Sequence, residues 1–201
     1  MTGKGMEEGR MFVLFAEILQ YPGPDMRDVA KECEALVASR HPQAAALLAE
    51  FLATTEGMRR ARLEEEYTRV FDMNPDSSPY VGYHLFQDTY KRSLFLIELK
   101  KRYREQDFPL DQKELPDHLC LILRFLAKSK DDELNRELIE EAILPSLDQI
   151  VKKNEKSAQP AQELGVYRSV LEALRLILQQ QPKGTRADGP VGLHQGGSSN
   201  V

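Results

Sequence analysis

The sequence predicts an all-α protein, a single-domain, compact multi-helix bundle. Apolar residues recur at intervals of three and four, the period of a helix, in almost every segment. Strict alternation of apolar and polar residues, which would indicate strands, is not sustained anywhere. A length of 201 residues also suits one domain with a buried core. We expect a flexible N-terminus over residues 1–9, a helical domain over 10–181, and a disordered tail, rich in glycine and polar residues, over 182–201.

Prolines and capping residues divide the first part of this domain into helices. The first helix is expected over about 10–20, because Pro22 and Pro24 directly after it cannot continue a helix. Asp25 can cap the second helix, which reaches about Ser39.

The third and fourth helices follow from similar signals. Pro42 suits the first position of the third helix, and Thr54 or Thr55 is the expected cap of the fourth. The turn-forming stretch 74–79 ends the fourth helix. That helix places three apolar side chains on one face: Tyr67, Val70 and Phe71.

The second half of the domain shows the same pattern. Pro116 opens a helix so rich in leucine and isoleucine that we expect it to be buried on most sides. The remaining helices are expected over about 80–105, over 131–144 with a kink or a new start at Pro145, and over 160–181.

Charge and cysteine content exclude several classes of protein. Lys and Arg number 27 against 32 Asp and Glu, a net charge of −5, and no basic block stands apart, so nucleic acid is not an expected partner. Cys33 and Cys120 form no metal-ligand cluster and indicate no disulfide framework. No stretch of about 18 uncharged apolar residues occurs, so we expect a cytoplasmic protein without membrane insertion.

The segment Glu114-Leu115-Pro116-Asp117-His118-Leu119 places an acid and a histidine at the start of the apolar helix. Pro116 and Asp117 suit a helix start, since proline fits the first turn and a carboxylate faces the positive end of the helix dipole. His118 is harder to explain, because a cation is unfavourable there and a neutral imidazole needs a hydrogen-bond partner. An acid/base pair of Asp117 and His118, joined by Glu114, is therefore a hypothesis, although the sequence contains none of the common catalytic motifs.

Tyr67, Val70 and Phe71, directly before an irregular loop, have two interpretations of equal weight. They are either part of the core or the lining of a groove that binds an apolar peptide. A generic helical interaction module is an alternative function. A less favoured alternative is a metal-dependent enzyme using His118 and Asp117, with His84 or Glu66.

Three segments, in this order and spacing, resemble motifs of the dedicated chaperones of molybdenum-containing respiratory enzymes, the TorD, DmsD and NarJ family. They are Glu66-Tyr67-Thr68-Arg69-Val70-Phe71, Tyr83-His84-Leu85-Phe86, and the Glu114 to Leu119 segment. The sequence from Leu110 to Leu119 most resembles the NarJ branch, which matures nitrate reductase. This sequence departs from some relatives in having no tryptophan, and Val70 stands where leucine is more usual.

The resemblance implies a cytoplasmic, non-catalytic protein of the TorD-like helical type, either a monomer or a domain-swapped dimer. Such proteins bind the N-terminal segment of a molybdoenzyme catalytic subunit, a twin-arginine signal peptide or its remnant, until the molybdenum cofactor is inserted. It implies no cofactor of the protein's own, only transient contact with the molybdenum cofactor through the client. Carried over by motif, the peptide site is expected to include the following residues: Tyr67, Val70, Phe71, Tyr83, His84, Phe86, Glu114, Pro116, Asp117 and His118.

Overall fold

The computed structural model describes residues 3–110, 113–155 and 164–180. Within these ranges the chain is helical and forms no strand, which confirms the predicted all-α class. The elements in chain order are α1 (Gly3–Ile18), α2 (Met26–Val37), α3 (Pro42–Thr55), α4 (Arg60–Tyr67), π-helix η1 (Thr68–Asp72), 3-10 helix η2 (Pro75–Ser77), α5 (Val81–Phe86), α6 (Tyr90–Glu105), α7 (Leu119–Lys128), α8 (Asp132–Glu137), π-helix η3 (Leu138–Ile143), α9 (Leu144–Glu155), 3-10 helix η4 (Gly165–Tyr167) and α11 (Arg168–Gln179). The predicted tail, 182–201, lies outside the described residues.

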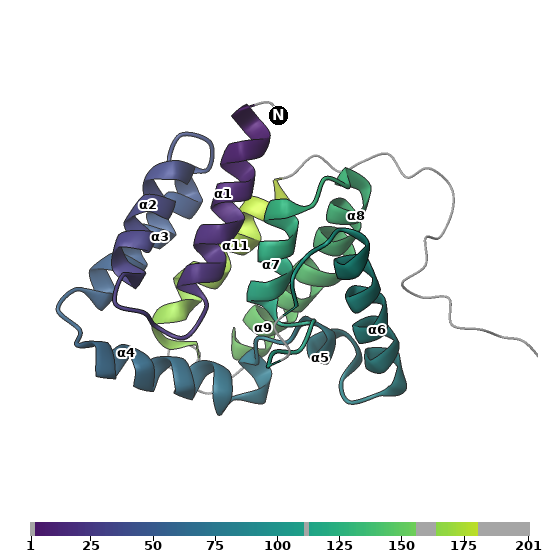
Figure 1. Ribbon diagram of the computed structural model, residues 1–201. Helices are drawn as coiled ribbons and strands as arrows, with labels where there is room; N and C mark the ends of the chain where they lie inside the picture. Colours follow the sequence, from purple (N-terminus) through teal and green to yellow (C-terminus); the bar gives the residue numbers. More distant parts are fainter. Residues whose placement is uncertain (1–2, 111–112, 156–163, 181–201) are drawn as a thin grey trace, which may run out of the picture.

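Helices α1, α7 and α11 form the centre of the molecule (Figure 1). Helix α1 packs against α7 on one side and α2 on the other, and α3 lies against both α2 and α11. The helix expected over 160–181 is described from residue 164, and one set of its apolar side chains is buried: Leu164, Tyr167, Val170, Leu171, Leu174 and Leu178. Helix α7 buries seven of its ten residues, as its composition predicts.

The N-terminus differs from the prediction, since residues 3–9 continue helix α1 instead of forming a flexible segment. Two contacts made by the first half of α1 explain why this segment is helical. Glu7 forms an ion pair with Arg40 at 2.7 Å, and a Cβ atom on Gly9 would lie 3.0 Å from the carbonyl oxygen of Ala127 in α7. Neither partner is near in sequence, so apolar spacing alone did not reveal them.

Helix boundaries in the first half are partly as predicted. Pro42 opens α3, as expected. Asp25 occupies the cap position of α2 but makes no side-chain capping bond. The prediction that Thr54 or Thr55 caps the fourth helix is wrong, because both threonines end α3 and the Thr55 hydroxyl donates to the carbonyl of Phe51 at 2.8 Å inside that helix.

Two boundaries that shape the site also differ from the prediction. The helix expected over 80–105 is broken into α5 and α6, since Gln87 adopts a left-handed φ of 53°. The helix expected to open at Pro116 begins at Leu119, and Pro116 lies buried in the turn before it. No new helix starts at Pro145, because the chain stays helical from α8 through the π-helix η3 into α9, which begins at Leu144.

Candidate functional site

A short antiparallel bridge joins the start of α5 to the start of α7. The amide of Val81 donates to the carbonyl of Asp117 at 2.9 Å, and the amide of Leu119 donates to the carbonyl of Pro79 at 2.8 Å. Tyr80 and His118, which are 38 residues apart in sequence, are thereby placed side by side. The bridge explains why the chain before α7 is extended and why the helix starts later than proline placement predicts.

His118 is the residue that caps α7, in place of Asp117, for which we predicted helix-start chemistry. Its Nδ1 atom accepts a hydrogen bond from the amide of Cys120 at 3.2 Å. An accepting Nδ1 places the proton of the neutral imidazole on Nε2, which lies 4.0 Å from Oε2 of Glu114. Burial lowers the pKa of His118, more strongly than Glu114 and Asp117 raise it, so the neutral form is favoured. A neutral histidine can cap a helix without opposing its dipole.

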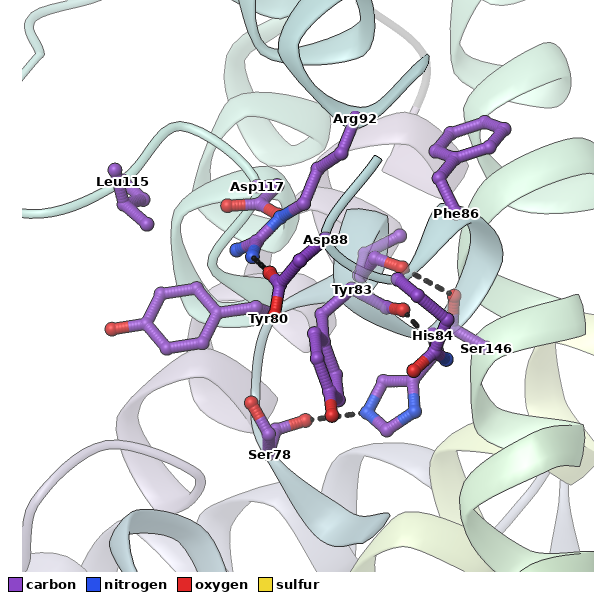
Figure 2. A network of polar contacts seen from close by, with 12 residues as sticks. Ser78, Tyr80, Tyr83, His84, Phe86, Asp88, Arg92, Leu115, Asp117 and Ser146 are labelled. Atoms are coloured by element: carbon purple, nitrogen blue, oxygen red, sulfur yellow. Dashed lines mark hydrogen bonds and ion pairs between the residues drawn. The ribbon is translucent and has the colours of Figure 1, made fainter. Parts of the chain in front are cut away.

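The side chain of Asp117 is completely buried and lies beside Arg92 (Figure 2). Its Oδ2 atom accepts a hydrogen bond from Nε of Arg92 at 3.1 Å, and Nη1 of the same arginine lies 3.2 Å from Oδ1 of Asp88. Burial raises the pKa of Asp117, while Arg92 acts in the opposite direction. Gly82 allows this approach, because a Cβ atom there would lie 2.8 Å from Oδ2 of Asp117 and 2.9 Å from Cδ1 of Phe95.

Tyr80 lies between the buried His118 and the partly exposed Glu114. Its ring meets the His118 ring edge-on at a centroid distance of 5.4 Å, and its hydroxyl donates to Oε1 of Glu114 at 3.1 Å. Burial and the Glu114 carboxylate raise the pKa of Tyr80 to about 12. The half-buried and exposed side chains here form what we call the Tyr80 surface, which consists of Tyr80, Tyr83, Asp88, Glu114 and Leu115.

Three other predicted residues support the backbone beneath this surface. Nε2 of His84 donates to the carbonyl of Ser78 at 2.7 Å, as Figure 2 shows. The carbonyl of Pro116 accepts a hydrogen bond from the Tyr103 hydroxyl at 2.8 Å. Phe86 packs on Phe95 at a ring distance of 5.6 Å. These residues hold the loops in place, and the side chain of His84 is buried.

Tyr67, Val70 and Phe71 lie in the core, so the core interpretation of this cluster is the one that the geometry favours. Tyr67 and Phe71 pack at 5.0 Å and both contact the ring of Tyr167, at 5.9 and 5.0 Å. Their side chains are 5–6% exposed and Val70 is fully buried. Burial raises the pKa of Tyr67, as expected for a hydroxyl within the core.

Sequence reasoning missed four residues of the site, namely Tyr80, Asp88, Arg92 and Leu115. Asp88 and Arg92 are four residues apart, a spacing typical of ion pairs along a helix, so the sequence could have indicated this pair. The partnership of Arg92 with Asp117, which are 25 residues apart, has no such signal.

The residues considered for a metal site lie apart or make other contacts in the part of the chain that the structure describes. No group of three or more His, Cys, Asp or Glu side chains there could hold a metal ion. His84 donates to a backbone carbonyl and Glu66 is paired with Arg62 and Arg69, both at 2.7 Å. Nor is any described helix long and apolar enough to cross a membrane.

A large hollow lies elsewhere, between the first half of α1 and the ends of α7 and α11. It has a volume of about 1000 Å³. Its lining includes Phe12, Leu36, Ala127, Ile139, Leu144 and Leu178, and none of the ten predicted site residues.

The family comparison covers the segment of the chain that contains these motifs. Residues 35–164 match the family described as nitrate reductase delta subunit. A Bacillus subtilis (strain 168) protein described as "Probable nitrate reductase molybdenum cofactor assembly chaperone NarJ" is 30% identical over 114 residues, which are 56% of this chain and 62% of that protein. The nitrate reductase molybdenum cofactor assembly chaperone NarJ of Escherichia coli (strain K12) is 27% identical over 60% of this chain and 52% of its own length.

Two further similarities extend beyond the NarJ proteins. The chaperone protein TorD of Pasteurella multocida (strain Pm70) is 32% identical over 64% of this chain and 66% of its own length. The crystal structure of a protein described as a redox enzyme maturation protein, from Archaeoglobus fulgidus, has a TM-score of 0.55 at 21% identity and shares the fold over 86% of this chain and 94% of that one. The chain thus spans between half and two thirds of the length of these NarJ relatives. Because the family match covers more than half of the sequence, the chain belongs to the nitrate reductase delta subunit family, among relatives that include NarJ and TorD chaperones.

Proposed function

We propose that this protein is a dedicated, non-catalytic chaperone that acts in the cytoplasm. Its client is the catalytic subunit of a molybdenum enzyme, a nitrate reductase or a related enzyme. It binds the N-terminal segment of that subunit, a twin-arginine signal peptide or its remnant, and assists insertion of the molybdenum cofactor and assembly. The relatives named NarJ support the client class, since their descriptions are those of nitrate reductase molybdenum cofactor assembly chaperones.

The observation that carries the proposal is the Tyr80 surface itself. It brings together two motifs that resemble the chaperone family, and it combines exposed apolar groups with carboxylates. Leu115 is 43% exposed, the side chain of Glu114 is 37% exposed, and that of Asp88 is 82% exposed. A peptide that carries both apolar and basic side chains matches this composition.

The energetics of such binding follow from burial and charge. Apolar surface buried against Tyr80, Tyr83 and Leu115 contributes roughly 25 cal/mol per Å². Basic side chains of the peptide would lie near Asp88 and Glu114, where charge-assisted hydrogen bonds fix the register. Val70 supports the loop that leads to Tyr80, because its carbonyl accepts a hydrogen bond from the Ser77 hydroxyl.

Binding of a labelled peptide tests the proposal. The probe is a fluorescein-labelled synthetic peptide with the N-terminal sequence of the nitrate reductase catalytic subunit from the same organism. We expect the peptide to bind the full chain and Leu115→Glu to weaken binding by about tenfold, because one exposed apolar contact is replaced by a charge. Ile97→Glu is the matched control, since Ile97 is 61% exposed on α6 and outside the Tyr80 surface.

The variants separate the possible binding surfaces. Absence of binding to the wild-type protein would refute the client class. Equal binding by Leu115→Glu and the wild type, together with loss of binding in Glu140→Lys, would place the peptide in the hollow beside α1, which Glu140 lines.

A further inference from the structure

We infer that Arg92 is the positioning residue through which the buried Asp117 acts on the peptide surface. This inference rests on the proposed function, because the effect that it explains is peptide binding. Arg92 lies outside the three motifs quoted above. Asp117, expected to contact the peptide, would instead affect binding by holding Arg92 in place.

The first argument is the burial of Asp117. Its side chain is 0% exposed, so a peptide at the surface does not reach the carboxylate. The fold encloses that carboxylate between the start of α5, where Gly82 has no side chain, and the guanidinium of Arg92. An effect of Asp117 on a bound peptide must therefore pass through a neighbour.

The second argument is the position of Arg92, whose side chain is 15% exposed and bridges the interior and the surface. Its Nε atom donates to Asp117 and its Nη1 atom donates to the exposed Asp88. Its guanidinium carbon also lies 5.7 Å from the ring centroid of Tyr80 and 5.8 Å from that of Tyr83. Figure 2 shows this arginine among the side chains of both tyrosines, Asp88 and Asp117.

These contacts fix the geometry of the Tyr80 surface. A guanidinium near an aromatic face is attracted to it, and contact with two rings at once limits how either can turn. Asp117 holds the arginine in this place, since a buried carboxylate needs a charged partner. Arg92 therefore orients Tyr80, Tyr83 and Asp88, three of the five residues that form the surface.

The inference predicts non-additive effects on peptide affinity. Arg92→Gln and Asp117→Ala should each raise the Kd of the labelled peptide by about tenfold, the usual scale for loss of a charged hydrogen bond. The double variant should also bind about tenfold more weakly than the wild type. Independent residues would multiply to about a hundredfold. Arg92→Lys keeps the charge and should recover part of the affinity.

A second measurement and a control separate positioning from folding. Fluorine NMR of protein labelled with fluorotyrosine should show the resonances of Tyr80 and Tyr83 shifting in Arg92→Gln. Arg102→Gln is the control, because Arg102 lies on the same helix and pairs with Glu98 at 2.8 Å. That variant should leave both the resonances and the Kd unchanged. Each variant is compared at a temperature at which circular dichroism shows it to be folded.

The outcomes distinguish this inference from the function on which it rests. Absence of peptide binding by the wild-type protein would refute the proposed function and the inference with it. Wild-type binding that Arg92→Gln leaves unchanged, or a double variant weakened by about a hundredfold, would overturn only the role of Arg92.

Discussion

Gly82 is the position where a single methyl group should disturb the site most directly. The substitution Gly82→Ala would place a Cβ atom 2.8 Å from Oδ2 of Asp117 and 2.9 Å from Cδ1 of Phe95. Neither neighbour can withdraw freely, because Asp117 is held by Arg92 and the Phe95 side chain is 3% exposed in the core. The methyl group must therefore push α5 away from the start of α7, where the bridge and the buried ion pair lie.

The magnitude follows from two opposing effects. Overpacking of a well-packed interior costs about 1–3 kcal/mol, and separation of Arg92 from Asp117 adds to that cost. Alanine gains up to about 1 kcal/mol over glycine in a helix, which offsets part of it. We expect the free energy of unfolding to fall by about 1–2 kcal/mol, which corresponds to a decrease in Tm of about 2–8 °C for a chain of this length.

Urea denaturation followed by circular dichroism measures the change, with Gly5→Ala as the matched control. Gly5 lies in helix α1 and a Cβ atom there would meet no atom within 4 Å, so this variant should be as stable as the wild type or slightly more stable. A Gly82→Ala protein as stable as Gly5→Ala would refute the claim that Asp117 and Gly82 are in close, rigid contact.

Other features of the structure lead to further expectations. The pKa of His118 is lowered below 6.5 in the folded state, so the unfolded chain binds more protons; its stabilising contribution is complete above pH 6.5 and is lost as the pH falls through the folded pKa. Denaturation of the wild type and of His118→Asn at several pH values should show a difference that falls toward acid pH, since asparagine caps without titrating; a difference independent of pH would contradict the neutral cap. Cys33 and Cys120 are buried, and burial raises the pKa of each thiol to about 12, so neither should react with a thiol reagent at neutral pH until the protein is denatured. Rapid labelling of the native protein would show that one of them is accessible. Tyr103→Phe removes the hydroxyl that binds the carbonyl of Pro116 and should lower the free energy of unfolding by about 1–3 kcal/mol; an unchanged urea midpoint would show that this bond does not hold the turn.

Helical periodicity predicted the fold because burial in this protein follows the apolar stripes. Helix α11 illustrates this, since the core encloses the apolar side chains that recur at intervals of three and four along it, Val170, Leu171, Leu174 and Leu178. Proline placement was reliable at Pro42, where the chain enters a helix directly. It failed at Pro116, because a backbone bridge to Tyr80 keeps the following residues extended, and such a tertiary contact leaves no trace in local spacing.

The sequence indicated several residues that the fold places close together, but not the contacts that each of them makes. The sequence indicated that His118 was unusual, and the structure explains it as a neutral cap whose imidazole also contacts Tyr80. Asp117 was assigned to the binding surface by resemblance, whereas its side chain lies in the interior. Its partner Arg92 could not be predicted, because the pairing joins residues that are 25 positions apart in the sequence.

Hydrogen–deuterium exchange with and without the client N-terminal peptide tests the central claim most directly. If the Tyr80 surface binds the peptide, protection should appear in residues 78–92 and 113–120, while the segments lining the hollow beside α1 exchange as in the free protein. Protection confined to α1, α8 and the end of α11, with none near Tyr80 and His118, would contradict the account.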